Sequence, residues 1–347
     1  MNNSESSIIL DPQKIAYWTI ILFGMMAMLI YGKALIIPIV LGVFLAVILS
    51  STRQAVKLIP VIGKYLNDAL VSVITLLVLV AIVLILSQAL SSQVEEFTEF
   101  QPLYEERFNH LVAMLGNKVH FDVTTFGASS QFAGLLGWFG ESISLVLSNV
   151  LLTFMFTMFL MAEQKMIPQK LASLAGTEEK AKNVQVVWQD IANSIQTYLS
   201  LKSIISALTA VATFAVLELM GVHFAAMWGI LVFFINFIPN LGSILGVALP
   251  ALQALLQFEQ FTPVLIIVGL LTVVQFVIGN LIEPAYLGTK LNLSPFIVLV
   301  SLTFWGAIWG LVGMFLAVPL MVLVSLICRR ISGLEWISTL LSIDGKR

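Results

Sequence analysis

The sequence Asn236-Phe237-Ile238-Pro239-Asn240-Leu241-Gly242-Ser243 interrupts a long apolar region that runs from Trp228 to Leu320. Asparagine, glutamine, proline and glycine recur through this region, which is otherwise apolar enough to lie in lipid. In hydrocarbon each unpaired backbone or amide group costs several kcal/mol, so such groups persist only where protein buries them or where they line a wet cavity. The pattern therefore predicts a pathway for a solute or an ion, and not a simple membrane anchor.

The composition of the whole chain is that of a membrane protein. Hydrophobic residues make up 59% of it and charged residues only 10%, whereas a soluble domain carries about 25% charged residues. The apolar residues come in blocks of roughly 15 to 20, which is the length of a membrane span. We therefore expect an all-α, polytopic integral membrane protein with about eight transmembrane helices.

Several classes of function are disfavoured. The net charge is −2, so there is no basic surface for nucleic acid. The three histidines have no metal-ligand spacing, and no glycine-rich phosphate-binding motif with its lysine is present. The sequence predicts neither an enzyme, nor a metal site, nor a cofactor.

The charges in the loops predict how the chain is oriented. The loop 51–68 carries Arg53, Lys57 and Lys64 against one acid, so by the positive-inside rule it is cytoplasmic, as is the N-terminus. The polar excursion 91–141 has seven acids and two bases, which fits the outside face. The expected order is a cytoplasmic tail (1–14), three transmembrane helices (15–90), an extracytoplasmic amphipathic helical excursion (91–141), a fourth transmembrane helix (142–161), a cytoplasmic amphipathic helix (162–202), a C-terminal transmembrane core with the pathway (203–328) and a cytoplasmic tail (329–347).

The apolar segments of the C-terminal core are short. Several hold only about 15 to 18 residues, which falls short of a hydrocarbon core of ~30 Å at ~1.5 Å per residue. Short segments interrupted by glycine or proline are typical of discontinuous or re-entrant helices. We expect such segments at 225–239, 241–257, 263–282, 295–309 and 311–328.

The first candidate site is the interruption itself. Asn236 and Asn240 would share a helix face, but Pro239 breaks that helix and frees a carbonyl upstream. Gly242 then lets the chain turn, and Ser243 is a plausible N-cap for a new helix. Free carbonyls, a helix N-terminus and two amides can hold a polar solute or a cation. The alternative is a structural Pro-Asn turn at the membrane surface.

The second candidate site lies about forty residues further on. Gln275 and Glu283 fall on one helix face with Asn280 beside them, and Pro284 is expected to end the helix. In one interpretation Glu283 is an interfacial acid paired with Lys290. In the other it is a carboxylate at the end of a polar path, suited to coupling with protons or cations.

Two residues before the core could act as a gate. Lys202 is expected to snorkel to the cytoplasmic surface, and gating by Lys202 with Tyr198 is the alternative. The segment that ends at Lys202 is expected to lie in the membrane interface, or else to move with the spans as a coupling helix. The glycines between Gly306 and Gly313 are expected to serve close helix packing.

Five motifs occur in a characteristic order along the chain. They are Trp228-Gly229, N-F-I-P-N-L-G-S-I-L at 236–245, G-N-L-I-E-P at 279–284, L-G-x-x-L-x-L-S-P at 287–295 and G-x-x-G-x-x-L-A-V-P-L at 310–320. This set resembles the autoinducer-2 exporter family of bacterial membrane proteins, and the resemblance covers nearly the whole chain. It implies a bacterial inner-membrane homo-oligomer, with a pentamer as one candidate state, that exports a small solute.

The resemblance leaves three functions open. The first is export of a small polar solute, with autoinducer-2 as a candidate, and the neutral amides of Asn236, Asn240 and Gln275 would suit a hydroxylated molecule. The second is Na+(K+)/H+ exchange with Glu283 as the titrating group, because other family members are similar to antiporters and amides suit sodium almost as well. The third is an oligomeric membrane scaffold whose outside excursion recruits a partner.

Overall fold

The structure, a computed structural model, describes residues 12–57, 149–164, 166–239, 241–258, 260–287, 293–329, 333–343 and 345, with scattered positions between 70 and 107. Every regular element in these residues is a helix, which confirms the all-α class for this part of the chain. The helices are α1 (Pro12–Tyr31), α2 (Lys33–Lys57), α6 (Val150–Glu163), α7 (Ile167–Ser173), α8 (Glu178–Leu219), α9 (Ala225–Ile235), α10 (Leu241–Gln257), α11 (Phe261–Phe276), the π-helix η2 (Val277–Ile282), α12 (Glu283–Leu287), α13 (Pro295–Cys328) and α14 (Glu335–Leu341).

The described part of the chain contains four helices long and apolar enough to cross a membrane. A fifth is counted if α6 and α7, which are bent by 64°, form one span. Shorter apolar helices accompany them, α9 and α10 among them. The protein is therefore a multi-pass membrane protein. The predicted third span is only partly described, and the count of eight stays a prediction.

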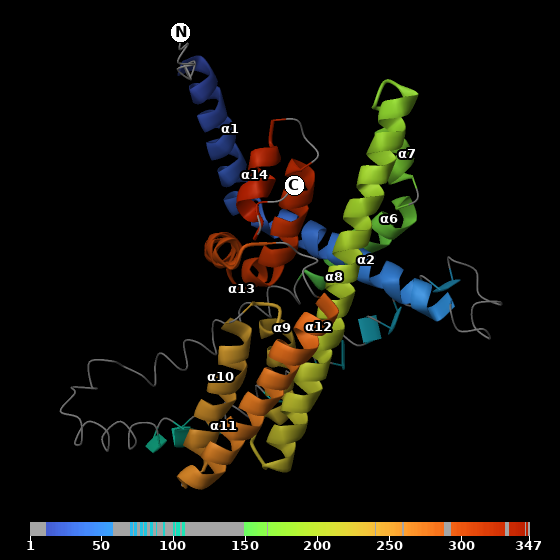
Figure 1. Cartoon of the computed structure of the whole chain (residues 1–347). Coiled ribbons are helices and arrows are strands. Elements are labelled where there is room, and N and C mark those ends of the chain that lie inside the picture. Colours follow the sequence, from blue (N-terminus) through green and yellow to red (C-terminus); the bar gives the residue numbers. More distant parts are fainter. Residues whose placement is uncertain are drawn as a thin grey trace.

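Helix α8 is the central helix of the described structure, and several other helices pack on it. Figure 1 shows α9, α10 and α11 beside its lower half and α6 and α7 beside its upper half, while α1, α13 and α14 lie together to the left of it. The contacts agree, because α8 packs on α9, α7, α2 and α11. Segments far apart in sequence thus meet near the middle of α8.

The predicted cytoplasmic helix and the predicted span after it form one continuous helix. The cytoplasmic amphipathic helix was expected to end at Lys202 and a span to begin at Ser203, but α8 is one helix of 42 residues. Its sequence contains neither glycine nor proline, so nothing inside it ends the helix. The Thr177 hydroxyl accepts from the Lys180 amide at its start. At ~1.5 Å per residue α8 is about 63 Å long, twice a hydrocarbon core, so its first half does not lie in the interface as a separate element.

Small residues let the helices approach closely. A methyl group on Gly42 of α2 would lie 3.0 Å from Cβ of Phe156 on α6. The same addition on Gly229 of α9 would lie 3.2 Å from the carbonyl oxygen of Ala210 on α8. Because lipid is as apolar as leucine, such close backbone contacts contribute much of the association between helices in membranes.

The described residues of the predicted outside excursion pack on the end of this chain's own helices. The hydroxyl of Tyr104 lies 3.0 Å from Nδ1 of His223, in the turn between α8 and α9. The Arg107 guanidinium donates to the carbonyls of Leu256 and Gln257, where α10 ends. A cation at the free carbonyls of a helix C-terminus is favourable, so these contacts tie the excursion to the lower end of the bundle. The rest of 91–141 lies almost entirely outside the described residues.

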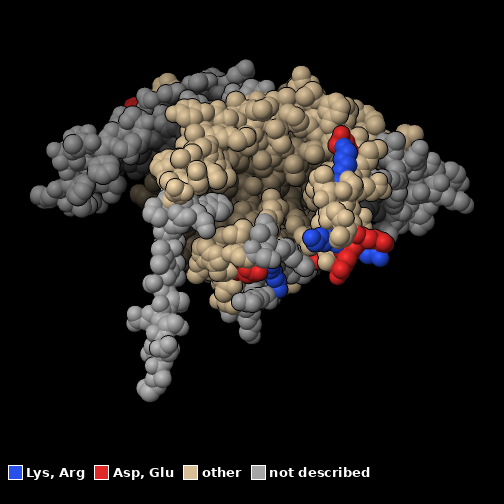
Figure 2. Space-filling view, turned by 90° about the horizontal axis from the view of Figure 1, so that it is seen from above, with Lys and Arg blue, Asp and Glu red and all other residues tan. Residues whose placement is uncertain are grey.

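Charges are sparse on the surface of the described residues. In the view of Figure 2 most of the described surface is uncharged, and the charged side chains gather in a few places. Two exposed ion pairs lie near α7 and the start of α8, Lys170–Glu163 at 2.9 Å and Lys182–Glu178 at 3.6 Å. Solvated pairs of this kind contribute little to stability, whereas the uncharged surface fits contact with lipid.

Candidate functional site

The described part of the polar interruption, residues 236–239, follows α9 and leads to α10, and these two helices form a helical hairpin, called here the first hairpin. A methyl group on Gly242 would lie 2.3 Å from the carbonyl oxygen of Ile235. One turn further, a methyl group on Gly246 would lie 3.6 Å from the side chain of Val232. These pairs show that α9 and α10 run antiparallel in close contact, so the predicted broken segment is confirmed here.

A second hairpin lies within α13. Gly310 has φ 62° and ψ −140°, a conformation that favours glycine, and it separates the limbs 295–309 and 311–328. The Ser301 hydroxyl donates to the carbonyl of Ala317 at 3.1 Å, across the two limbs. A methyl group on Gly313 would lie 1.9 Å from the carbonyl oxygen of Trp305. The predicted segments 295–309 and 311–328 are therefore confirmed as a folded-back pair, and the packing role predicted for Gly313 is confirmed.

The turn of the first hairpin packs on the second hairpin. The ring centroids of Phe237 and Phe315 are 4.4 Å apart. Ile238 forms a buried cluster with Leu302 and Ala317. Two hairpins, each too short per limb to cross ~30 Å of hydrocarbon at ~1.5 Å per residue, thus meet at Phe237–Phe315. We call this contact the hairpin junction.

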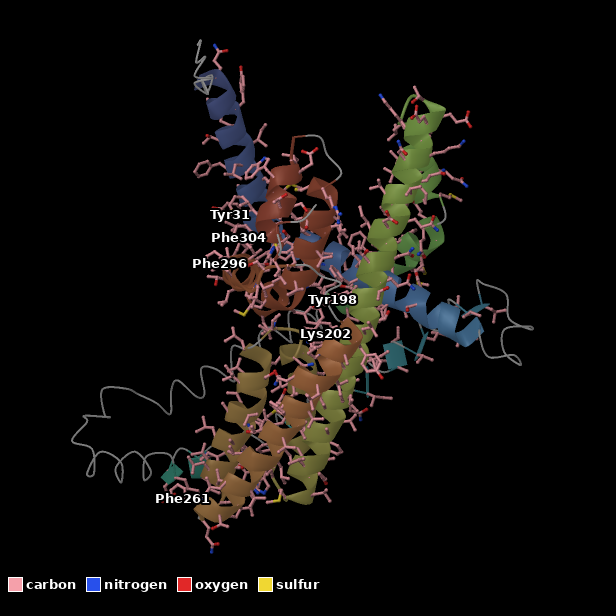
Figure 3. All side chains as sticks on the ribbon, viewed as in Figure 1. Tyr31, Tyr198, Lys202, Phe261, Phe296 and Phe304 are labelled. Atoms are coloured by element: carbon pink, nitrogen blue, oxygen red, sulfur yellow. The ribbon has the colours of Figure 1, made fainter. Side chains whose placement is uncertain are left out.

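An ion pair between distant parts of the chain lies beside these elements. Nζ of Lys202 on α8 is 2.5 Å from Oε1 of Glu283, the first residue of α12. The Lys202 side chain is 4% exposed and the Glu283 side chain 25% exposed. Figure 3 shows Lys202 and Tyr198 on the middle of α8, beside α12. Mutual neutralisation and a hydrogen bond offset the cost of placing these charges away from water.

The structure around this ion pair corrects the expectations for Lys202 and for Pro284. Lys202 does not snorkel to the surface, because it is 3% exposed and bound to a carboxylate from another helix. Glu283 has Lys202 as a partner, and the predicted partner Lys290 lies outside the described residues. Pro284 does not end the helix either: the π-helical turn η2 leads into α12, which continues to Leu287. A π-helical turn changes the hydrogen-bond pattern, and such turns are frequent at functional sites.

A buried polar face runs along α8 from the ion pair. Lys202, Ser206, Thr209 and Thr213 follow at helical spacing, and all are at most 3% exposed. The Nδ2 of Asn236 donates to Oγ of Ser206 at 3.0 Å, which joins this face to the turn of the first hairpin. Ser206, Thr209 and Thr213 were not among the predicted site residues, although polar residues at positions i, i+4, i+7 and i+11 of a helix share one face and could have indicated them.

The other predicted site residues fall into three groups. Gln275 is buried, and its Nε2 would lie 2.6 Å from a methyl group on Gly246. Ser243 is half-buried, and its hydroxyl would lie 3.7 Å from a methyl group on Gly279. Ser243 is the third residue of α10 and not its N-cap, because the helix already begins at Leu241. Pro239 is half-buried, Tyr198 and Gly242 are buried, Asn280 and Pro284 are exposed, and Asn240 lies outside the described residues.

The arrangement can therefore offer a solute uncharged hydrogen-bonding groups beside one neutralised ion pair. Asn236 and Gln275 supply amides, and Ser206, Thr209 and Ser243 supply hydroxyls. Both candidate sites contact α8, the first through Asn236 and Ser206 and the second through Glu283 and Lys202. Such groups exchange hydrogen bonds with water or with a hydroxylated solute.

Comparison with known proteins agrees with this architecture. The family model described as AI-2E family transporter matches residues 18–333. The AI-2 transport protein TqsA of Escherichia coli (strain K12) is 30% identical over 339 residues, covering 93% of this chain and 95% of that protein. The putative transport protein YhhT of the same strain is 28% identical and covers 88% and 86%. A putative transport protein of Borreliella burgdorferi is 34% identical over 195 residues, 56% of this chain and 54% of that protein.

Proposed function

Since the chain belongs to the AI-2E family of transporters, we propose that it exports a small, neutral, polar solute across a bacterial inner membrane, with autoinducer-2 as the first candidate. The relative called AI-2 transport protein TqsA supports this candidate at modest identity. We further propose that eight spans and cytoplasmic termini complete the topology.

The observation that carries the proposal is the Lys202–Glu283 ion pair beside the hairpins. A free carboxylate in an apolar setting would attract a cation, but this carboxylate already has a lysine ammonium 2.5 Å away. The pair as a whole is neutral, and the remaining polar side chains near it are amides and hydroxyls. Such a site binds hydroxyl groups through hydrogen bonds without paying for the burial of a net charge.

We propose that the solute passes the hairpin junction. The junction lies beside the polar face of α8, since Asn236 at the start of the turn donates to Ser206. The contact between the hairpins is made by aromatic and aliphatic side chains, which can separate without leaving an unpaired polar group. Separation of the hairpins would then open a route, and Tyr198 and Lys202 would gate it from α8.

Exchange of sodium or potassium for protons is the second candidate. One observation favours it: Glu283 is a quarter exposed, so its carboxylate is reachable for a proton or a cation. A cation would then have to displace Lys202 from Glu283. Transport by this route would depend on Glu283 and on the pH gradient, which separates it from passage of a neutral solute.

The test measures flux into inverted membrane vesicles, with autoinducer-2 and with radioactive sodium, in the presence and absence of a pH gradient. We expect autoinducer-2 to accumulate through the wild-type protein and sodium not to. In the Glu283→Gln variant we expect autoinducer-2 flux to fall, because Lys202 loses its charged partner. The matched control is Glu218→Gln, an exposed acid near the end of α8. Sodium flux that needs Glu283 and follows the pH gradient would establish the antiporter instead.

We also propose a homo-oligomer, as the resemblance implies. Large apolar side chains are exposed on α1, α2, α11 and α13 of the single chain, and lipid or further copies of this chain can cover them. The contacts of Tyr104 and Arg107 with the chain's own bundle favour an internal role for that part of the excursion over recruitment of an outside partner. Native mass spectrometry of the purified protein would give the number of copies.

A further inference from the structure

We propose that Gln253, Thr213 and Trp228 form a subsite that binds the hydroxyl groups of a neutral solute, at the lower end of the α8–α11 bundle. This inference rests on the proposed function, because it deepens the pathway that begins at the Lys202–Glu283 pair. Gln253 and Thr213 lie outside the motifs named above, and Trp228 occurs there only as part of the family resemblance.

The first observation is that their polar atoms are buried and unpaired. Gln253 and Thr213 are 0% exposed and Trp228 is 1% exposed. Within the part of the chain that the structure describes, no hydrogen-bond partner meets Oε1 or Nε2 of Gln253, Oγ1 of Thr213 or Nε1 of Trp228. Folded proteins pair about nine in ten of their buried polar groups, and the exceptions call for a water, an ion or a ligand. Four unpaired atoms on three helices therefore indicate a common guest.

The second observation is that the three residues lie at one level of the bundle. Asn236 bonds to Ser206, and Gly229 lies against Ala210 and Phe214, so α8 and α9 run antiparallel with Thr213 level with Trp228–Gly229. Between α9 and α10, Gly242 lies against Ile235 and Gly246 against Val232.

The same antiparallel register between α9 and α10 places Gln253 level with Ala225. Residues 225 and 228 are separated by less than one helical turn, about 4.5 Å of axial rise. Gln253 also lies on the buried stripe of α10 that includes Gly246 and Leu249. The three residues therefore lie within about one helical turn of each other along the bundle axis.

The chemistry of the three side chains selects the class of guest. The amide of Gln253 offers both a donor and an acceptor, the hydroxyl of Thr213 offers both, and the indole of Trp228 offers only a donor. Two oxygens and an N–H make a poor cation site, since hard cations need several oxygen ligands. None of the three carries a charge for an anion, and Arg107, the cation that the described residues place nearby, is already bound to the carbonyls of Leu256 and Gln257. Hydroxyl groups, which donate and accept, match all three.

The proposed subsite is separate from the Lys202–Glu283 ion pair. Thr213 lies eleven residues beyond Lys202 on α8, which is about 16 Å along the helix. Thr209 and Gln275 lie between these levels, and Nε2 of Gln275 also has no partner in the described residues. A solute leaving the Lys202–Glu283 level would therefore meet uncharged hydrogen-bonding groups on the way to Gln253.

The test uses the full-length protein and the variants Gln253→Leu and Thr213→Val. Each removes unpaired polar atoms and keeps a similar volume, so the thermal unfolding temperature should be maintained or raised. We expect the KM for autoinducer-2 flux to rise about tenfold in each, the effect of losing one to two good hydrogen bonds. The matched control is Gln260→Leu, the same change at an exposed position just before α11, which should leave KM unchanged.

Binding is read separately from flux, by the shift of the unfolding temperature on addition of autoinducer-2, D-ribose or D-ribonate. We expect the neutral solutes to stabilise the wild type more than the anion does, and Gln253→Leu to lose that shift. An unaltered KM and shift in Gln253→Leu, or loss of stability together with flux, would overturn the subsite, because Gln253 would then be inert or structural. Absence of any shift with the neutral solutes would overturn it too. Binding without flux in the wild type would overturn the proposed function and leave the subsite standing.

Discussion

Replacing Lys202 by methionine is expected to destabilise the folded protein by about 3–5 kcal/mol, the usual cost of removing one partner of a buried ion pair. The Glu283 carboxylate would lose the ammonium 2.5 Å away and remain three-quarters buried beside α8. Methionine keeps the length and apolar stem of lysine, so lost packing contributes little. Thermal unfolding in detergent, followed by loss of monodisperse protein, measures the effect.

The double variant Lys202→Met with Glu283→Gln separates charge from shape. It removes both charges, so most of the lost stability should return, because replacing a whole buried pair is often nearly neutral. The matched control is Lys182→Met, which breaks the exposed pair with Glu178 and should have little measurable effect. If Lys202→Met and Lys182→Met behave alike, the buried pair does not hold α8 against α12.

Replacing Gly313 by alanine is expected to cost about 3 kcal/mol, the upper end for overpacking. The added methyl group would lie 1.9 Å from the carbonyl oxygen of Trp305 and 3.0 Å from Cβ of Trp309, and a backbone atom cannot move aside as a side chain can. The limbs of the second hairpin would have to separate, which would also weaken the bond from Ser301 to Ala317. The amount of folded protein recovered from the membrane and its unfolding temperature measure the loss.

Gly269 provides the matched control for this change. It lies inside α11, is exposed, and a methyl group there would meet nothing within 4 Å. Alanine at an unhindered helical position is more favourable than glycine by about 0.5–1 kcal/mol, so Gly269→Ala should be neutral or stabilising. Equal behaviour of the two alanine variants would mean that the limbs of α13 are not packed as tightly as the structure has them.

Local sequence signals predicted the hairpins well. The segment expected at 241–257 matches α10, because Pro239 ends the preceding helix and Gly242 permits the close turn that follows. The segments 295–309 and 311–328 flank Gly310, whose positive φ breaks α13. In each case a glycine or a proline indicates the break, because these residues change the backbone conformation at their own position and need no distant contact to do so.

Features that depend on distant contacts were not predictable in this way. From the sequence alone Lys202 is expected at the surface, because nothing near it in sequence indicates that Glu283, 81 residues away, lies beside it. Gln253 reads as an ordinary helix residue, because an amide on an apolar helix looks the same whether it faces water, a neighbour or a guest. The continuity of α8 was missed for a different reason: the lysines marked 162–202 as a cytoplasmic helix separate from the span after it, although no residue there stops a helix.

The central claim is that a solute passes the hairpin junction, and crosslinking this junction tests it most directly. Phe237→Cys and Phe315→Cys would be combined with Cys328→Ser, which removes the chain's single native cysteine. In inverted vesicles a short, reducible crosslinker between the two thiols should stop autoinducer-2 flux, and reduction should restore it, while each single cysteine variant keeps its flux under the same treatment. Undiminished flux through fully crosslinked protein would contradict passage at the junction.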